Sequence, residues 1–466
     1  MEYIEFLKSK IDIAPKTGIE ISEEDVNPIL KPHQRDAVIW AVRGGRRALF
    51  ESFGLGKTVQ ALEWCNIITR KEGGQALIVL PLGVKQEFKR DAVELLGLDE
   101  PQYVRNMNEV QAATSRIVLT NYERVRDGDI DPTYFKAVSL DEAAVLRSFG
   151  SKTYQTFLQK FKGIPYKLVN TATPSPNKYK ELIHYGGFLE VMDTGQALTR
   201  FFKRDSTKAN HLTLYPERED EFWVWLSSWA LFITKPSDLG YDDTGYDLPP
   251  LKINYHKLSD SGVTVDRDGQ FELTRDLALS LSECAAEKRN SIDRRVAVAK
   301  KIIDSEPDNN FIIWHDLEAE RHAIKKAIPD VVDIYGSQDY DLREKRVIDF
   351  SNGKTRLFAT KKELSGSGCN FQKHCHRAIF LGIDYEFNDF IQAVHRIYRF
   401  LQTEQVVIDI ILTENEEGIL DVLQKKWQQH NYLTKKMTDI IKRYGLSNAN
   451  TSQLERKLGV ERVQVN

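Results

Sequence analysis

The sequence predicts an α/β fold made of two successive blocks, each a mostly parallel sheet flanked by helices. The evidence is a set of short apolar runs that are spaced like buried strands, with helical patterns between several of them. These runs lie at 76–81, 116–122, 135–141 and 167–173 in the first block and at 311–314, 331–335, 355–360, 377–383 and 406–412 in the second. Alternating strands and helices form parallel sheets covered on both faces, and such sheets bind ligands at the carboxyl ends of their strands.

The domain boundaries follow from shifts in composition. Gly, Pro and Asp dominate 235–250, which we expect to be a linker. The other expected parts are an N-terminal extension at 1–24, a first lobe at 25–234 with a helical segment at 177–232, a second lobe at 251–435 and a basic helical tail at 436–466. Before the linker, Trp223, Trp225 and Trp229 are expected to pack against the first lobe, with base stacking as the alternative.

Composition excludes several classes of protein. The chain has 466 residues, 41% of them hydrophobic, and a net charge of −3, so it is not a nonspecific basic protein. It has no apolar run of membrane-spanning length, and its first residues lack the apolar core and small-residue cleavage site of a signal peptide. Its four cysteines do not look like a disulfide framework in a chain of this length. The spacing of Cys369, His374, Cys375 and His376 does not match a zinc site. We therefore expect a cytoplasmic protein without a membrane partner.

A phosphate-binding loop is the most specific motif. Gly54, Gly56, Lys57 and Thr58 stand between a strand-like and a helix-like segment, where backbone N–H groups and a helix N-terminus can cradle a nucleotide's phosphates. Lys57 is expected to reach the β- and γ-phosphates, and the Thr58 hydroxyl to hold Mg²⁺. Glu51 stands where the common pattern has glycine.

An acidic pair follows the apolar run that ends at Leu140. Asp141 is expected to bind Mg²⁺, and Glu142 to orient and deprotonate the attacking water. Asp-Glu alone is a weak signal, but it is strong when it lies downstream of a phosphate-binding loop.

The order of the motifs resembles a known family. Segment 30–34, the phosphate-binding loop, Asp-Glu-Ala-Ala at 141–144 and Thr-Ala-Thr-Pro at 171–174 follow the order of superfamily-two helicases of the DEAD/DEAH-like kind. The chain most resembles Snf-type, chromatin-remodeller-like DNA translocases, in a compact bacterial or phage form. The resemblance implies two RecA-like P-loop lobes with a helical insertion and a C-terminal helical segment. It also implies that Gln34 reads adenine, and that an acidic residue near the position of Glu51 is usual.

The resemblance also assigns the remaining site residues. Gly368 would contact the nucleotide, and the coupling of hydrolysis to DNA would involve Thr171, Thr173 and Gln392. The positions that the resemblance implies contact DNA are Thr120, Tyr122 and Asn370. Lys361 and Lys362 depart from the family, whose members mostly carry small residues there. Their place beside the glycine-rich segment favours a contact with DNA phosphates, and simple exposure is the alternative.

Two arginines match the family's terminal motif. Arg396 and Arg399 are three residues apart, so on a helix they would share a face. Arginines aimed at a γ-phosphate are worth roughly 10³–10⁵ in rate. The alternative is an ordinary surface helix.

These observations predict an ATP hydrolase, a monomeric DNA-dependent translocase that uses ATP and Mg²⁺. Duplex DNA is the favoured partner, and single-stranded DNA is possible. An RNA or single-strand helicase and a catalytically weak DNA-binding clamp are the alternatives, the latter because the acidic motif ends in Ala-Ala. The late basic residues Lys425, Lys426, Lys435, Lys436, Lys442 and Arg443 form either a solvated helix face or a contact with duplex phosphates.

Overall fold

A computed structural model of the chain describes residues 14–175, 178–204, 212–259, 281–362, 364 and 370–444. The chain divides into two compact units, 1–243 with 430–466 and 244–429, which we call the first and second lobes. The division falls inside the segment 235–250 that we expected to be a linker. Residues 430–435, which we expected in the second lobe, are grouped with the first.

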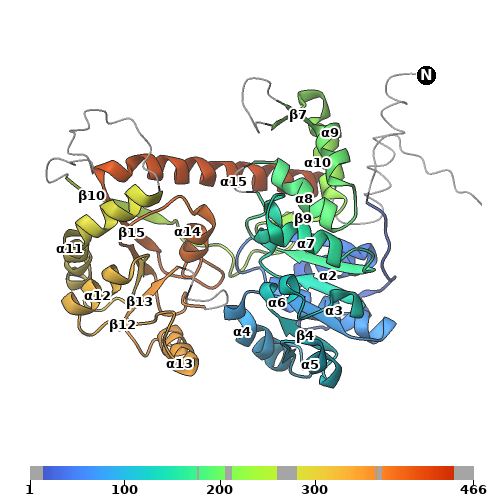
Figure 1. The fold of residues 1–466 in the computed structure, drawn as a ribbon, viewed down its shortest axis with the longest axis horizontal. Helices are drawn as coiled ribbons and strands as arrows, with labels where there is room; N and C mark the ends of the chain where they lie inside the picture. Colours follow the sequence, from blue (N-terminus) through green and yellow to red (C-terminus); the bar gives the residue numbers. More distant parts are fainter. Residues whose placement is uncertain are drawn as a thin grey trace, which may run out of the picture. The chain divides into compact units, whose positions relative to one another are not determined.

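The first lobe is built on a seven-stranded sheet of order β3-β4-β2-β5-β6-β1-β9, in which all neighbours are parallel (Figure 1). The strands are β1 (Arg46–Glu51), β2 (Ala76–Val79), β3 (Gln102–Tyr103), β4 (Ile117–Thr120), β5 (Ala137–Leu140), β6 (Tyr166–Asn170) and β9 (Ala230–Ile233). The apolar runs of the first block therefore form strands, as expected.

The segment 177–232, which we expected to be helical, holds three helices among its described residues and also contains strands. Its end forms most of β9, and β7 (Phe202–Arg204) pairs antiparallel with β8 (Leu212–Leu214). A short apolar run such as β9 has no periodicity that separates a buried strand from a helix end.

Helices flank this sheet, and α3 packs over β2, β4, β5 and β6. The helices of the first lobe are α2 (Pro32–Gly44), α3 (Lys57–Glu72), α4 (Lys85–Arg90), α5 (Met107–Ala112), α6 (Tyr122–Asp127), α7 (Lys152–Lys160), α8 (Lys180–Phe188), α9 (Thr194–Phe201) and α10 (Glu219–Ser227). Trp223, Trp225 and Trp229 are at most 1% exposed. The Trp229 ring packs edge-on against Phe50 of β1. Packing is thus confirmed, and the base-stacking alternative was wrong because no face of these rings reaches solvent.

The second lobe has a six-stranded, wholly parallel sheet of order β10-β15-β14-β11-β13-β12. Its strands are β10 (Lys252–Leu258), β11 (Phe311–His315), β12 (Val332–Asp333), β13 (Leu357–Lys361), β14 (Arg377–Phe380) and β15 (Val407–Thr413). Five of these match the predicted runs. The edge strand β10 was not predicted, because its sequence mixes polar and apolar residues and none of them is fully buried.

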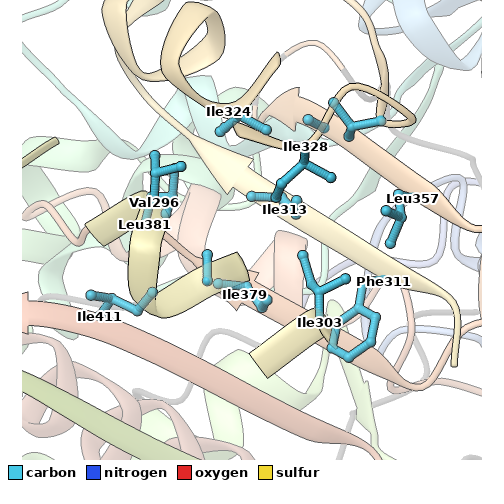
Figure 2. Close-up of a cluster of buried hydrophobic side chains, with 13 residues drawn as sticks. Val296, Ile303, Phe311, Ile313, Ile324, Ile328, Leu357, Ile379, Leu381 and Ile411 are labelled. Carbon is cyan, nitrogen blue, oxygen red and sulfur yellow. The ribbon is translucent and has the colours of Figure 1, made fainter. Parts of the chain in front are cut away.

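The helices of the second lobe are α11 (Leu281–Ser305), α12 (Glu318–Ala327), α13 (Tyr340–Ser351) and α14 (Phe387–Val394). A long helix, α15 (Glu417–Tyr444), follows. Figure 2 shows the apolar core between α11, α12 and one face of the sheet. Residues two apart on each strand, such as Phe311 and Ile313, supply this face, as the pleat requires.

Two helix-flanked parallel sheets confirm the predicted fold class of two RecA-like lobes. In the part of the chain that the structure describes, no helix is both long and apolar enough to cross a membrane.

Candidate nucleotide-binding site

The central strands of the first sheet bring the predicted motifs together. β5, β6 and β1 are neighbours in that order, and all three are parallel. Their carboxyl ends therefore lie at the same edge of the sheet. The acidic pair Asp141–Glu142 follows β5, Thr171 follows β6, and the phosphate-binding loop at 52–56 follows β1.

The backbone of this loop needs glycine. Gly54 and Gly56 both have φ of +86°, a conformation that residues with a Cβ rarely adopt. A Cβ on Gly56 would lie 2.3 Å from Gln34 Nε2. Gly56 caps α3, whose 16 residues begin at Lys57. The N-terminus of this helix attracts anions, and it opens directly from the loop.

Lys57 rests at the base of the loop. Its ammonium donates to the carbonyls of Glu51 at 2.8 Å and of Ser52 at 3.1 Å, and lies 5.6 Å from the centre of the Phe53 ring. The sequence did not identify Gln60, whose amide donates to the Glu51 carboxylate at 2.7 Å. The signal that could have identified Gln60 is its position as a polar residue on the buried face of α3, the helix that follows the loop.

Gln34 contacts the same loop. Its Nε2 donates to the Leu55 carbonyl at 2.9 Å, and its Oε1 accepts the Lys31 N–H at 3.0 Å. The residue expected to read adenine therefore also fixes the start of α2 against the phosphate-binding loop.

The acidic pair combines a buried carboxyl group with an unfavourable backbone conformation. Asp141 is 6% exposed, and burial together with the neighbouring Glu142 raises its pKa well above the usual range, while Lys57 acts in the opposite direction. Glu142 has φ of +48°, which costs a non-glycine residue about 1 kcal/mol or more.

These residues fit a magnesium ion. A buried carboxylate with a raised pKa is stabilised in its charged form by a cation. Asp141 and the Thr58 hydroxyl would supply the hard oxygen ligands that Mg²⁺ prefers. Among the described residues, no group of three or more His, Cys, Asp or Glu side chains could hold a metal. The zinc reading of the Cys369–His376 segment gains no support from Cys375, whose thiol contacts the Asn310 and Arg377 carbonyls at 3.3 Å.

Thr171 lies next to the acidic pair. Its hydroxyl is 3.4 Å from Glu142 Oε2, and it accepts the Thr173 N–H at 3.2 Å. Both threonines are fully buried. The two predicted coupling residues of this lobe thus contact a predicted catalytic carboxylate directly or through one hydrogen bond.

Two residues predicted to contact DNA are engaged elsewhere. Thr120 is fully buried at the end of β4 and its hydroxyl donates to the Val104 carbonyl at 2.9 Å, which disfavours its predicted contact with DNA. Tyr122 stacks on Phe157, and its hydroxyl donates to the Asp141 carbonyl at 2.6 Å. The Tyr122 hydroxyl therefore braces the acidic pair from within the fold.

The carboxyl edge of the second sheet carries a network of charges. Lys362 follows β13, and its side chain, 6% exposed, lies 3.0 Å from Asp316 and 2.6 Å from Asp384. Lys288 of α11 also pairs with Asp316. Two carboxylates already enclose the Lys362 ammonium, which disfavours its predicted contact with phosphate. Lys361 is more open and pairs with Glu318 at 3.1 Å.

The glycine-rich segment is described only in part. Gly368 lies outside the described residues. Asn370 is half-buried, and its carbonyl accepts the Ser351 hydroxyl at 2.9 Å. Gln392 lies on α14 and is half-buried. Gln402 follows the turn that carries Arg396 and Arg399, and it is 4% exposed. Its Nε2 lies 3.1 Å from three carbonyls, those of Gln372, Cys375 and Ile397.

Arg396 and Arg399 do not share a helix face, contrary to expectation. α14 ends at Val394, and both arginines follow in a turn. The Arg396 carbonyl accepts the Phe371 N–H at 3.3 Å, which ties this turn to the end of the glycine-rich segment.

Three of the six late basic residues have intramolecular partners within the described ranges. Lys436 pairs with Glu219, Lys442 lies 2.9 Å from Asp238, and Lys426 donates to the Tyr385 carbonyl at 2.9 Å. Lys425 and Lys435 are exposed, so the solvated face and the contact with phosphates both stay predictions.

The structure has two helix-flanked parallel sheets, and the phosphate-binding loop and the acidic pair lie at one edge of the first. Residues 33–213 match the model of the SNF2-related domain family. This match supports the resemblance to Snf-type ATPases over that part of the chain.

Comparison with solved structures gives the Sulfolobus solfataricus SWI2/SNF2 ATPase core in complex with dsDNA, at 17% identity and a TM-score of 0.41. The alignment covers 94% of this chain and 99% of that one. No curated protein sequence matches the chain.

Proposed function

We propose that this protein is an ATP-dependent DNA motor that hydrolyses ATP and tracks along DNA, with duplex favoured over single strands. The observation that carries the proposal is the meeting of the phosphate-binding loop, Asp141–Glu142 and Thr171 at one edge of the first sheet. The SNF2-related domain at 33–213 supports it.

The roles of the residues follow from their chemistry. Lys57 and the N-terminus of α3 would bind the β- and γ-phosphates. Mg²⁺, held by Thr58 and Asp141, would neutralise charge on the phosphates. Glu142 would take the proton of the attacking water. Thr171, whose hydroxyl lies 3.4 Å from Glu142 Oε2, would couple hydrolysis to the contact with DNA. Arg396 and Arg399 of the second lobe would complete the site as arginine fingers.

Replacing Glu142 with Gln tests the proposed base. We expect turnover to fall about 10²-fold or more while nucleotide affinity changes little, because the amide keeps the shape but cannot accept the proton. Glu72→Gln, an exposed position at the far end of α3, is the matched control. Unchanged turnover in Glu142→Gln would remove this residue from its role.

Stimulation of ATP hydrolysis by different nucleic acids tests the substrate. We expect duplex DNA to stimulate most, single-stranded DNA less and RNA least. Stimulation by RNA alone would favour an RNA helicase of the same superfamily. Nucleotide-dependent DNA binding without turnover would favour the clamp.

A further inference from the structure

Glu51 is a buried carboxylate directly before the phosphate-binding loop, and the proposed mechanism does not use it. It is the last residue of β1 and is fully buried. Its Oε2 accepts the Gln60 amide at 2.7 Å, and in the described part of the chain its Oε1 has no hydrogen-bond partner. The Gln60 amide also lies 3.2 Å from the Leu55 carbonyl. The carboxylate is thus built into the support of the loop.

Lys57 is the charged group that faces Glu51 in the described structure. Its ammonium rests on the carbonyl of Glu51 itself and on that of Ser52. Burial raises the pKa of Glu51 to about 7, and Lys57 and the Gln60 hydrogen bond act to lower it. Lys57 also lowers the pKa of Asp141, whereas the neighbouring Glu142 raises it. One ammonium therefore compensates carboxylates on both sides of the loop.

We infer that Glu51 is a positioning residue for Lys57 and that it takes up a proton from solvent when a nucleotide binds. The inference rests on the proposed function. An ionised Glu51 attracts the ammonium toward the base of the loop. Phosphate oxygens compete for the same ammonium and bring negative charge close to Glu51. Both effects favour the neutral carboxyl in the bound state, and the proton adds to a carboxylate oxygen without any other change in bonding.

The sign of the pH dependence follows by linkage. Below pH 7 the carboxyl is already neutral, so binding needs no proton. Above pH 7 binding must be accompanied by proton uptake, and affinity falls as the pH rises until the pKa of the bound state is reached. If binding raises the pKa of Glu51 by about one unit, the ratio of wild-type to Glu51→Gln dissociation constants grows about sixfold between pH 6.5 and 8.5.

The experiment measures binding of ADP with Mg²⁺ to the full chain by calorimetry across this pH range. Taking the ratio to Glu51→Gln cancels the titration of the nucleotide and of all other groups. Glu63→Gln is the matched control. Glu63 is a buried carboxylate on α3, the helix of Lys57 and Gln60, and it is hydrogen-bonded to Asn27 and Asn66 rather than to the loop. That control should keep the wild-type pH dependence.

A second measurement needs no variant. Binding to the wild type in two buffers of different ionisation enthalpy at pH 7.5 should show net proton uptake of a fraction of a proton. A flat ratio, or no uptake by the wild type, would overturn the inference while leaving the proposed function standing. Absence of ADP binding at every pH would overturn both.

Discussion

At the scale of the residue, the Tyr122 hydroxyl connects two motifs that are separate in the sequence. It donates to the Asp141 carbonyl at 2.6 Å while its ring stacks on Phe157. Tyr122→Phe keeps the ring and removes the hydrogen bond. We expect a loss of about 1 kcal/mol in the free energy of unfolding and a several-fold fall in ATP turnover, with nucleotide affinity unchanged.

The matched control is Tyr154→Phe. The Tyr154 hydroxyl is also buried and lies 3.2 Å from both the His184 carbonyl and the Thr194 hydroxyl, away from the acidic pair. It should lose similar stability without loss of turnover in steady-state kinetics. An equal fall in turnover for both variants would show that Tyr122 acts only through stability.

The lysines after β13 differ in their environment although they are adjacent. Lys362 is enclosed by Asp316 and Asp384, whereas Lys361 is 27% exposed. We expect Lys362→Met to cost about 3–5 kcal/mol in urea unfolding, because it leaves buried carboxylates uncompensated. Lys361→Met should cost under about 1 kcal/mol.

The same two variants separate stability from DNA contact. The salt dependence of DNA binding should be unchanged by Lys362→Met, since a lysine without phosphate contact releases no counterion. If the DNA affinity of Lys362→Met depended less steeply on salt concentration than that of the wild type, Lys362 would contact DNA phosphates after all.

At the scale of the element, Arg295 of α11 joins the ends of two strands. Its guanidinium donates to the carbonyls of Leu381 and Ile411 and pairs with Glu416 at 2.6 Å, with both side chains at most 1% exposed. Arg295→Met should therefore lower the free energy of unfolding by about 3–5 kcal/mol.

An exposed pair on the same helix provides the comparison for Arg295. Lys300 and Asp304 lie 2.7 Å apart and are about half-exposed, so Lys300→Met should change stability by at most about 0.5 kcal/mol. Urea unfolding followed by circular dichroism measures both. Similar losses for the two variants would contradict the importance of burial.

At the scale of the whole molecule, the end of α15 belongs to the first lobe. Leu433 and Met437 are fully buried, and Lys442 pairs with the buried Asp238. We expect Met437→Ala to destabilise the protein by about 2–5 kcal/mol, because a cavity replaces a packed side chain. The exposed Asp439→Ala on the same helix should change it by at most about 0.5 kcal/mol, as thermal or urea unfolding can check.

Much of the fold could be predicted because the signals are local. Buried parallel strands have continuous apolar runs, so β2, β5 and β14 were visible in the sequence, and Gly56 with Lys57 marks the start of α3. The edge strand β10 was not visible, because a partly exposed strand lacks such a run. The turn that carries Arg396 was expected to be helical, since spacing of three is equally compatible with a helix and with a turn.

The sequence by itself determined the class of site: a phosphate-binding loop, an acidic pair after a strand and their order along the chain. Only the tertiary structure decided what each polar side chain contacts. It placed Thr120 inside the sheet, enclosed Lys362 between two carboxylates and set Tyr122 against Asp141. The reason is physical. Motifs depend on local backbone geometry, which neighbouring residues encode, whereas the burial and pairing of a side chain depend on segments that lie far away in the sequence.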